Sequence, residues 1–269
     1  MTVAVGEGTR RRTSAAVGVT FGLGLLAWIA FVAWATDMGM AAGPGTMGLS
    51  SVGFLVMWTL MMAAMMLPTV APLVSLYARS VQHRPGRLVM FGAGYVLAWA
   101  STGVVAFGLA SLFDELAQER PGTAHGVAVV ALAGCGVYQL TPMKRWCLRH
   151  CRSPIGHLLT YANYKGTTRD LRAGSHHGLL CIGCCWMLMV GLVVVGVMNL
   201  PVMLGLAVLI ALEKRWRYGE HLARAVGVGA ILFAIAVAFA AGLAPGLNHP
   251  DKPTPMDEMS GTAPLTNRR

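Results

Sequence analysis

Charged side chains are scarce in this chain: Asp, Glu, Lys and Arg make up only 12% of its 269 residues. Soluble globular domains carry about 25% charged residues, so the composition excludes an ordinary soluble domain. The sequence also lacks a Gly-x-Gly-x-x-Gly fingerprint, a phosphate-binding loop and an internal repeat. It contains no recognisable hydrolytic triad and no carboxylate pair for acid–base work. We therefore do not expect conventional enzymatic turnover.

The chain contains long apolar segments instead. Apolar residues make up 55% of it, and the mean hydropathy is +0.60. A membrane-crossing helix needs about 20 such residues. The runs cover residues 17–36, 52–77, 88–112, 124–141, 179–198, 200–213 and 221–243. We predict an all-α fold, a polytopic transmembrane helix bundle with about seven spans. The sixth run is short and follows an Asn199-Leu200-Pro201 break, and if that break is only a kink, the spans number six.

Positive charge is unevenly divided between alternate connecting segments. Of the 21 Lys and Arg residues, 17 lie in 1–16, 78–88, 142–178 and 213–224, and four lie in 37–50, 114–123 and 244–269. Short cytoplasmic loops are enriched in Lys and Arg, so we predict that the N-terminus lies inside and the C-terminus outside. The net charge of +10 thus points to the lipid bilayer of the inner (cytoplasmic) membrane, and we expect no nucleic-acid partner.

The same pattern divides the chain into three parts. We expect a basic N-terminal tail over 1–16 and a transmembrane helical domain over 17–243. The remaining segment, 244–269, contains several prolines and is expected to be a disordered tail.

Three cysteines, Cys181, Cys184 and Cys185, stand near the start of the fifth apolar run. Their i, i+3, i+4 spacing places the three thiols on one face of a helix. Soft sulfur ligands gathered in this way select Cu(I) or Zn(II), or else take part in disulfide exchange. Helix packing alone gains little from three thiols in one turn, so we predict that the triplet is functional.

A second cysteine pair, Cys147 and Cys151, follows the fourth run. The pair faces one way if 143–151 is helical, and the basic side chains around it favour the thiolate form. With Cys135 included, the predicted topology places all six cysteines at one depth near the inner face. Structural disulfides are not expected on that reducing side.

Two further kinds of side chain are candidate ligands. Met61, Met62, Met65 and Met66 form adjoining stripes in the second run and approach the predicted depth of the cysteines. Methionine is also an ordinary filler of apolar cores, so packing is the alternative. Glu213, at the inner end of the sixth run, is either an interfacial ion-pair partner of Lys214 or Arg217, a proton acceptor or a hard ligand.

Several motifs resemble a bacterial family of predicted metal-binding integral membrane proteins, a domain of unknown function whose members are sometimes labelled copper chaperones. The resemblance covers about residues 50–215. It rests on Trp58 to Pro68, Gly94-Tyr95 with Trp99, Tyr138 to Lys144 followed by Cys147 and Cys151 to Pro154, Gly183 to Met189, Gly196 to Asn199, and Glu213-Lys214. A departure is Pro201-Val202-Met203, where the family has an aromatic residue followed by Met. The resemblance implies metal binding and specifies no reaction.

The sequence thus predicts a membrane protein that binds Cu(I) and passes it to a membrane or soluble partner, buffers it or moves it across the membrane. In this interpretation the triplet is the main site, Cys147 and Cys151 receive the ion, and the four methionines form a weaker relay. The alternatives are a membrane thiol–disulfide oxidoreductase, a structural Zn(II) site closed by Cys147, Cys151 and two of the triplet, and a scaffold or assembly subunit.

Overall fold

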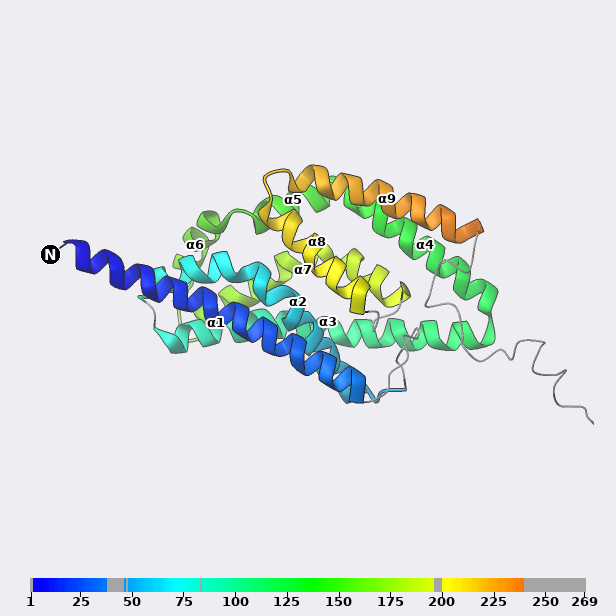
Figure 1. Cartoon of the computed structure of the whole chain (residues 1–269), viewed down its shortest axis with the longest axis horizontal. Helices are drawn as coiled ribbons and strands as arrows, with labels where there is room; N and C mark the ends of the chain where they lie inside the picture. The colour runs from blue at the N-terminus through cyan, green and yellow to red at the C-terminus, as the bar shows by residue number, and fades with distance from the viewer. Residues whose placement is uncertain (1, 38–45, 47, 83, 196–199, 240–269) are drawn as a thin grey trace, which may run out of the picture.

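The computed structural model describes residues 2–37, 46, 48–82, 84–195 and 200–239, and these residues form helices and connecting turns only. The fold is therefore all-α, as predicted. The described helices are α1 (Thr2–Asp37), α2 (Ser51–Ser80), α3 (Pro85–Glu119), α4 (Pro121–Leu140), α5 (Pro142–Cys151), α6 (Pro154–Ala162), α7 (Arg169–Val195), α8 (Leu200–Arg215) and α9 (Gly219–Phe239). Figure 1 shows α7 and α8 in the middle of the molecule, with α1 along one side and α4 and α9 paired on the other.

Six of the described helices are long and apolar enough to cross a membrane, which indicates a multi-pass membrane protein. They are α1 from Ser14, α2, α3, α4, α7 and α9. The predicted short sixth span over 200–213 corresponds to α8, which has 16 residues. At about 1.5 Å per residue such a helix is shorter than the hydrocarbon core of a bilayer. The structure thus shows six candidate spans, and the predicted number of seven is not confirmed.

The helices extend beyond the predicted apolar runs in two functionally relevant places. The predicted inner loop over 142–178 contains the short helices α5 and α6, so Cys147 and Cys151 do lie on one helix. The fifth run was expected to begin at residue 179, whereas α7 begins at Arg169. A hydropathy profile detects only the apolar part of a helix, so it does not detect the polar first turns of α7. The predicted tail over 1–16 is helical from Thr2 onward, and the predicted tail over 244–269 lies outside the described residues.

Proline and polar caps determine where the connecting helices begin. The helices α3, α4, α5 and α6 each start with a proline, whose missing N–H costs nothing in the first turn. The side chain of Thr141 accepts a hydrogen bond from the Lys144 backbone N–H at 3.2 Å and so caps α5. α5 therefore starts directly after α4 and carries Lys144 and both cysteines toward the bundle.

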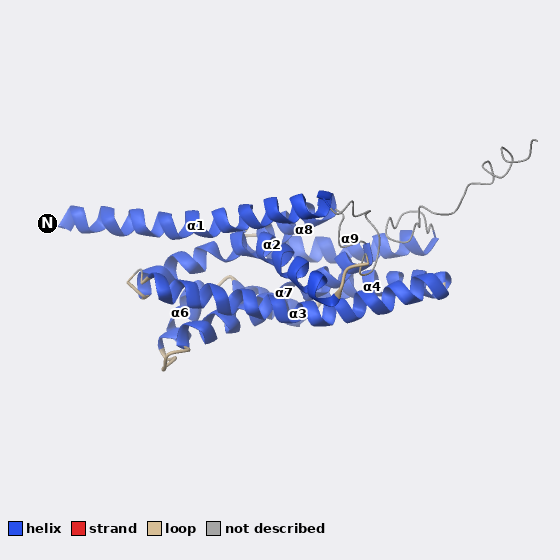
Figure 2. Ribbon diagram, turned by 90° about the horizontal axis from the view of Figure 1, so that it is seen from below, coloured by secondary structure: helices blue, strands red, loops and turns tan. Residues whose placement is uncertain are grey.

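The helices α3 and α7 pack closely because glycines lie at their contact. A Cβ on Gly94 would lie 2.1 Å from the Leu171 carbonyl oxygen, and one on Gly174 would lie 1.9 Å from the Phe91 carbonyl oxygen. Small residues of this kind let membrane helices approach backbone to backbone. The two helices run beside each other below α2 in the view of Figure 2. This contact places Tyr95 of α3 next to the cysteine face of α7.

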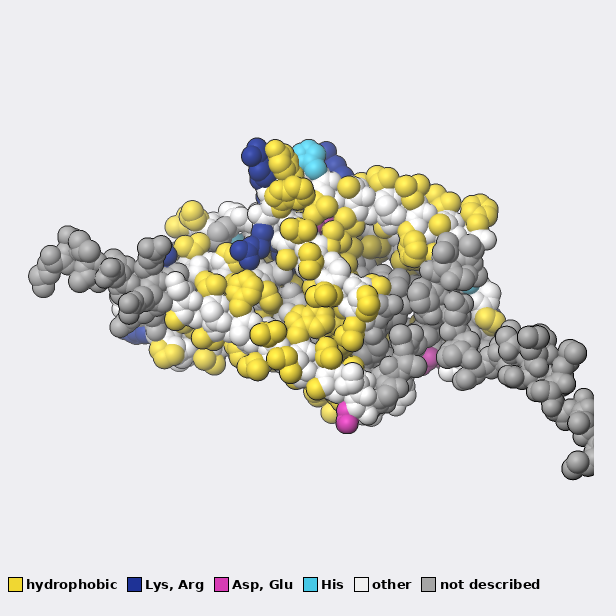
Figure 3. All heavy atoms as spheres, viewed as in Figure 1, with side chains coloured by type: hydrophobic (Ala, Val, Ile, Leu, Met, Phe, Trp, Pro, Cys, Tyr) yellow, Lys and Arg dark blue, Asp and Glu magenta, His cyan; other side chains and the backbone are white. Residues whose placement is uncertain are grey.

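The largest buried cluster joins residues of α1 to α8 and contains methionines, aromatic side chains and five of the six cysteines. The outer surface is also largely apolar, as expected for a lipid-facing protein (Figure 3). On the face in that view, Lys and Arg side chains gather where α8 passes into α9, beside α5. The apolar interior therefore contains the sulfur atoms, and one group of surface cations lies near α5 on this face.

Replacing Gly174 by Ala should separate α3 from α7, because the added methyl group would overlap the Phe91 carbonyl. We expect a loss of about 1–3 kcal/mol or more in unfolding free energy, measured as thermal unfolding of the detergent-purified protein. Gly92→Ala on α3 is the matched control, since nothing lies within 4 Å of its added Cβ. Equal unfolding temperatures for the two variants would contradict this account of the contact.

Candidate metal centre

The three cysteines of α7 form a compact, buried thiol cluster. The Sγ atoms of Cys181, Cys184 and Cys185 all lie within 4.8 Å of one another, and each residue is at most 2% exposed. The helical spacing predicted this shared face. All six cysteines of the chain are free thiols, in agreement with the expected absence of structural disulfides. Three soft donors at such distances can bind a single soft ion.

Hydrogen bonds to the helix backbone orient two of these thiols. The Sγ atoms of Cys184 and Cys185 both donate to the Cys181 carbonyl oxygen, at 3.1 and 3.0 Å. Because one acceptor serves both thiols, their sulfur atoms are drawn to the same side of α7. The cluster is therefore arranged by the helix itself.

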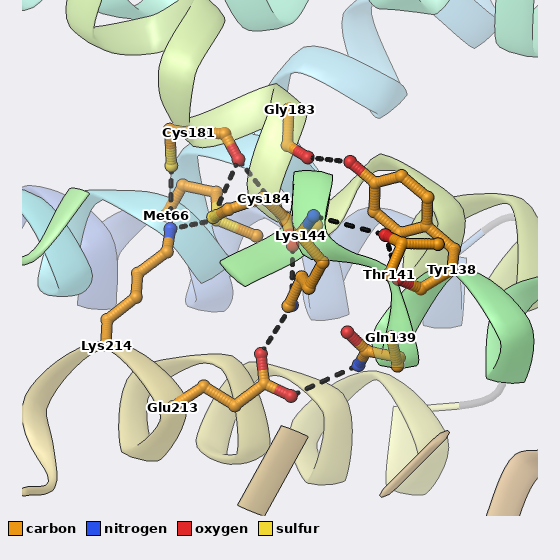
Figure 4. Close-up of polar contacts among 11 residues, drawn as sticks. Met66, Tyr138, Gln139, Thr141, Lys144, Cys181, Gly183, Cys184, Glu213 and Lys214 are labelled. Carbon is orange, nitrogen blue, oxygen red and sulfur yellow. Dashed lines mark hydrogen bonds and ion pairs between the residues drawn. The ribbon is translucent and has the colours of Figure 1, made fainter. Parts of the chain in front are cut away.

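Two side chains from other helices contact the Cys181 sulfur. The Lys214 ammonium of α8 donates to Cys181 Sγ at 2.7 Å, and the Tyr95 hydroxyl of α3 lies 3.1 Å from the same atom (Figure 4 shows the lysine). Lys214 Nζ also lies 4.0 Å from Met66 Sδ of α2. A buried thiolate needs a nearby positive charge, and Lys214 is placed to supply it. Side chains of α3 and α8 thus meet at the Cys181 sulfur of α7, and Met66 of α2 joins this group through Lys214.

The cysteines of α5 lie against the same face of α7. Cys151 makes a side-chain hydrogen bond with Cys184, and this bond together with burial raises the pKa of Cys151 well above its ordinary value. Cys147 is 4% exposed, and its sulfur would lie 3.1 Å from a Cβ placed on Gly183. Burial is the main cause that raises the pKa of Cys147. The structure therefore brings the α5 pair to the α7 triplet.

A buried ion pair lies beside the thiols. Lys144 of α5 donates to the Glu213 carboxylate of α8 at 2.7 Å and to the Cys184 carbonyl oxygen at 2.5 Å. Gln139 of α4 donates to the other Glu213 oxygen at 3.1 Å (Figure 4). The Lys144 and Glu213 side chains are 0% and 1% exposed. Glu213 thus belongs to an ion pair, but its partner is Lys144 and neither Lys214 nor Arg217.

The four candidate methionines are all buried in the main cluster. Met66 reaches the site through its contact with Lys214. Met61, Met62 and Met65 belong to the same apolar cluster on α2. Their placement agrees with packing, and a role as ligands remains a prediction.

The sequence analysis assigned no role in the site to Tyr95 or Gln139. It treated Lys144 only as one of the basic side chains near Cys147 and Cys151, and Lys214 only as a candidate ion-pair partner of Glu213. Each contacts the site across a long sequence separation, such as the 69 positions between Lys144 and Glu213. A cation within a basic stretch looks like an ordinary loop residue until its partner is known. A signal was nonetheless present, because all four lie in the motifs that carry the family resemblance.

Comparison with known proteins gives one finding. The sequence model of the PpoB2 family, described as "Copper chaperone", matches residues 55–237. No curated protein and no solved structure matches the chain. The match includes α5, α7 and α8, and so covers every residue of the site just described.

Lys144→Met should be strongly destabilising, because it leaves the Glu213 charge buried without its cation. We expect a loss of about 3–5 kcal/mol in unfolding free energy. The double variant Lys144→Met/Glu213→Met should recover most of this loss, since it buries no unpaired charge. Arg149→Met, which breaks the exposed pair with Glu220, should leave the unfolding temperature nearly unchanged. A double variant as unstable as the single one would refute this view of the pair.

Proposed function

Because the chain belongs to the PpoB2 copper chaperone family, we propose that it binds Cu(I) at Cys181, Cys184 and Cys185 and passes the ion to a partner protein. The observation that carries this proposal is the buried cluster of three thiols within 4.8 Å of one another. The partner is a membrane or soluble copper-receiving protein, as the family description implies.

The chemistry of the donor set favours a soft ion. Thiolates and thioethers select Cu(I), whereas carboxylates suit hard cations. Both oxygens of Glu213 already accept hydrogen bonds, from Lys144 and Gln139, so we place Glu213 outside the ligand set as the charge partner of Lys144. Sulfur is then the donor that the site offers to a metal ion.

Release of the ion requires other ligands nearby. Cys151, in contact with Cys184, is placed to take the ion from the triplet, and Cys147 follows on the same face of α5. In this scheme Cu(I) moves by exchanging one sulfur for another and is never free. Met66, and behind it Met61, Met62 and Met65, would form a weaker thioether relay.

Lys214 gives the metal-free site its charge balance. Its ammonium contacts the Cys181 sulfur, and Cu(I) would bring a further positive charge to the same cluster. Ligand thiols lose their protons when a metal binds, so the fixed cation favours the thiolates that remain. We therefore propose that Lys214 is a counter-ion of the thiolate cluster and does not bind the metal.

We also propose that this chemistry faces the inner side of the inner (cytoplasmic) membrane. α8 begins five residues after α7 ends, and Lys214 at its far end returns to Cys181 near the middle of α7, so the chain reverses direction between the two helices. That reversal supports seven passes, with the N-terminus inside and the C-terminus outside.

The first test is the metal content of detergent-purified protein after anaerobic loading with Cu(I), measured by elemental mass spectrometry. We expect about one copper ion per chain, lost when Cys181, Cys184 and Cys185 are all replaced by Ser. Cys135→Ser is the control, because Cys135 is a buried thiol of α4 outside the triplet. Undiminished copper in the triple variant would refute the proposed site.

Two other results of this measurement would favour the rival functions. Zinc that survives purification, with unfolding on chelation, would indicate a structural site closed by Cys147, Cys151 and two thiols of the triplet. Protein that takes up no metal but forms mixed disulfides through these thiols would indicate thiol–disulfide exchange.

The topology can be tested with a phosphatase that is active only outside the cytoplasm. Fused after Phe239, the end of α9, it should be active if α8 completes a seventh pass. The same enzyme fused after Arg215, the end of α8, should be inactive. An inactive phosphatase after Phe239 would instead indicate six spans.

A further inference from the structure

An open pocket lies where α5, α6 and α7 meet. It has a volume of about 610 Å³ and is lined by three histidines, His150, His157 and His176, together with Trp146 and Arg149. Neither the thiol cluster nor the proposed sulfur relay uses these histidines. Imidazole is a common copper ligand, so the pocket invites the question whether it handles the same ion.

The hydrogen bonds of two of these rings determine which nitrogen is free. His157 Nε2 lies 2.7 Å from the His150 carbonyl oxygen, and His150 Nδ1 lies 2.8 Å from the Trp146 carbonyl oxygen. A carbonyl can only accept, so in each neutral ring the bonded nitrogen carries the hydrogen and the other nitrogen carries a lone pair. Histidines that bind metals are commonly held in this way.

A fourth histidine connects the pocket to the thiols. His177 is 5% exposed, and its ring centroid lies 5.1 Å from that of His157. It precedes Cys181 by four residues, so the two side chains share one face of α7. Its ring stacks on Tyr95 at 6.0 Å, and the Tyr95 hydroxyl lies 3.1 Å from Cys181 Sγ.

His177 also has an unsatisfied atom. Its Nδ1 is buried and has no hydrogen-bond partner among the described residues. Leaving a buried polar atom unpaired costs about 1–3 kcal/mol, so such an atom calls for an explanation. A ligand that binds this nitrogen only for part of the working cycle would provide one.

We propose that His157 and His177 form the route by which Cu(I) exchanges between the open pocket and the thiols of α7. This inference rests on the proposed function of the thiol cluster. Within the described residues, only the thiols gather three metal-binding atoms within 4.8 Å, so the histidines hold the ion in passing and do not store it. The step exchanges ligands on Cu(I), one imidazole for another and then a thiolate, without any change in oxidation state.

The test is the rate of Cu(I) transfer from its coloured complex with bathocuproine disulfonate to the full-length protein in detergent. His157→Phe and His177→Phe keep an aromatic ring but remove the nitrogens. We expect each to slow uptake by about tenfold or more, with the final copper content unchanged. His125→Phe is the matched control, because His125 also has an unpaired Nδ1 but lies at the far end of α4 from Gln139.

A second arm uses the variant in which Cys181, Cys184 and Cys185 are Ser. Measured while Cu(I) is still in excess in solution, X-ray absorption should show weakly held Cu(I) with nitrogen ligands, lost on adding His157→Phe. Thiol-bound copper that arrives at the wild-type rate in both histidine variants would overturn the route alone. Absence of thiol-dependent copper from the wild-type protein would overturn the route together with the proposed function. If His177→Phe fails to fold, the rate of His157→Phe decides the matter.

Discussion

The buried ion pair between Lys144 and Glu213 is the interaction on which the arrangement of the site depends. Lys144 bonds the Glu213 carboxylate on α8 and the Cys184 carbonyl oxygen on α7, while Gln139 on α4 holds the second carboxylate oxygen. Burying two charges is costly unless both are fully paired, so these helices are constrained to one relative position. The position of α8 in turn determines where Lys214 meets the thiols.

The site therefore combines two kinds of order. The thiols are arranged locally, by the turn of a single helix and by a shared bond to the Cys181 carbonyl. Their charge environment is arranged globally, by side chains from α3, α5 and α8. The turn of α7 supplies the sulfur donors for a soft ion. The packing of the other helices supplies the counter-charge and the neighbouring sulfur of Cys151. A chaperone needs both, because it must bind the ion and also release it.

Periodicity and hydropathy were sufficient to predict the long apolar helices and the common face of Cys181, Cys184 and Cys185, because both depend on residues close in sequence. They were not sufficient for Lys144, which pairs with a residue 69 positions away. Nor did hydropathy indicate how far α7 extends, because the helix begins ten residues before its apolar run. What the sequence left open is therefore long-range pairing and the polar ends of helices.

The glycines between α3 and α7 are positions where a mutation can impair the sulfur site without removing a sulfur atom. The close approach at Gly174 sets how near Tyr95 comes to Cys181, although neither Gly94 nor Gly174 has a side chain that could bind a metal. A change at this position would loosen the sulfur site while every sulfur remained. If the thiols bind copper as proposed, such a variant would lose copper while keeping every cysteine. Mutations that impair the site can therefore fall at more positions than the metal-binding residues themselves.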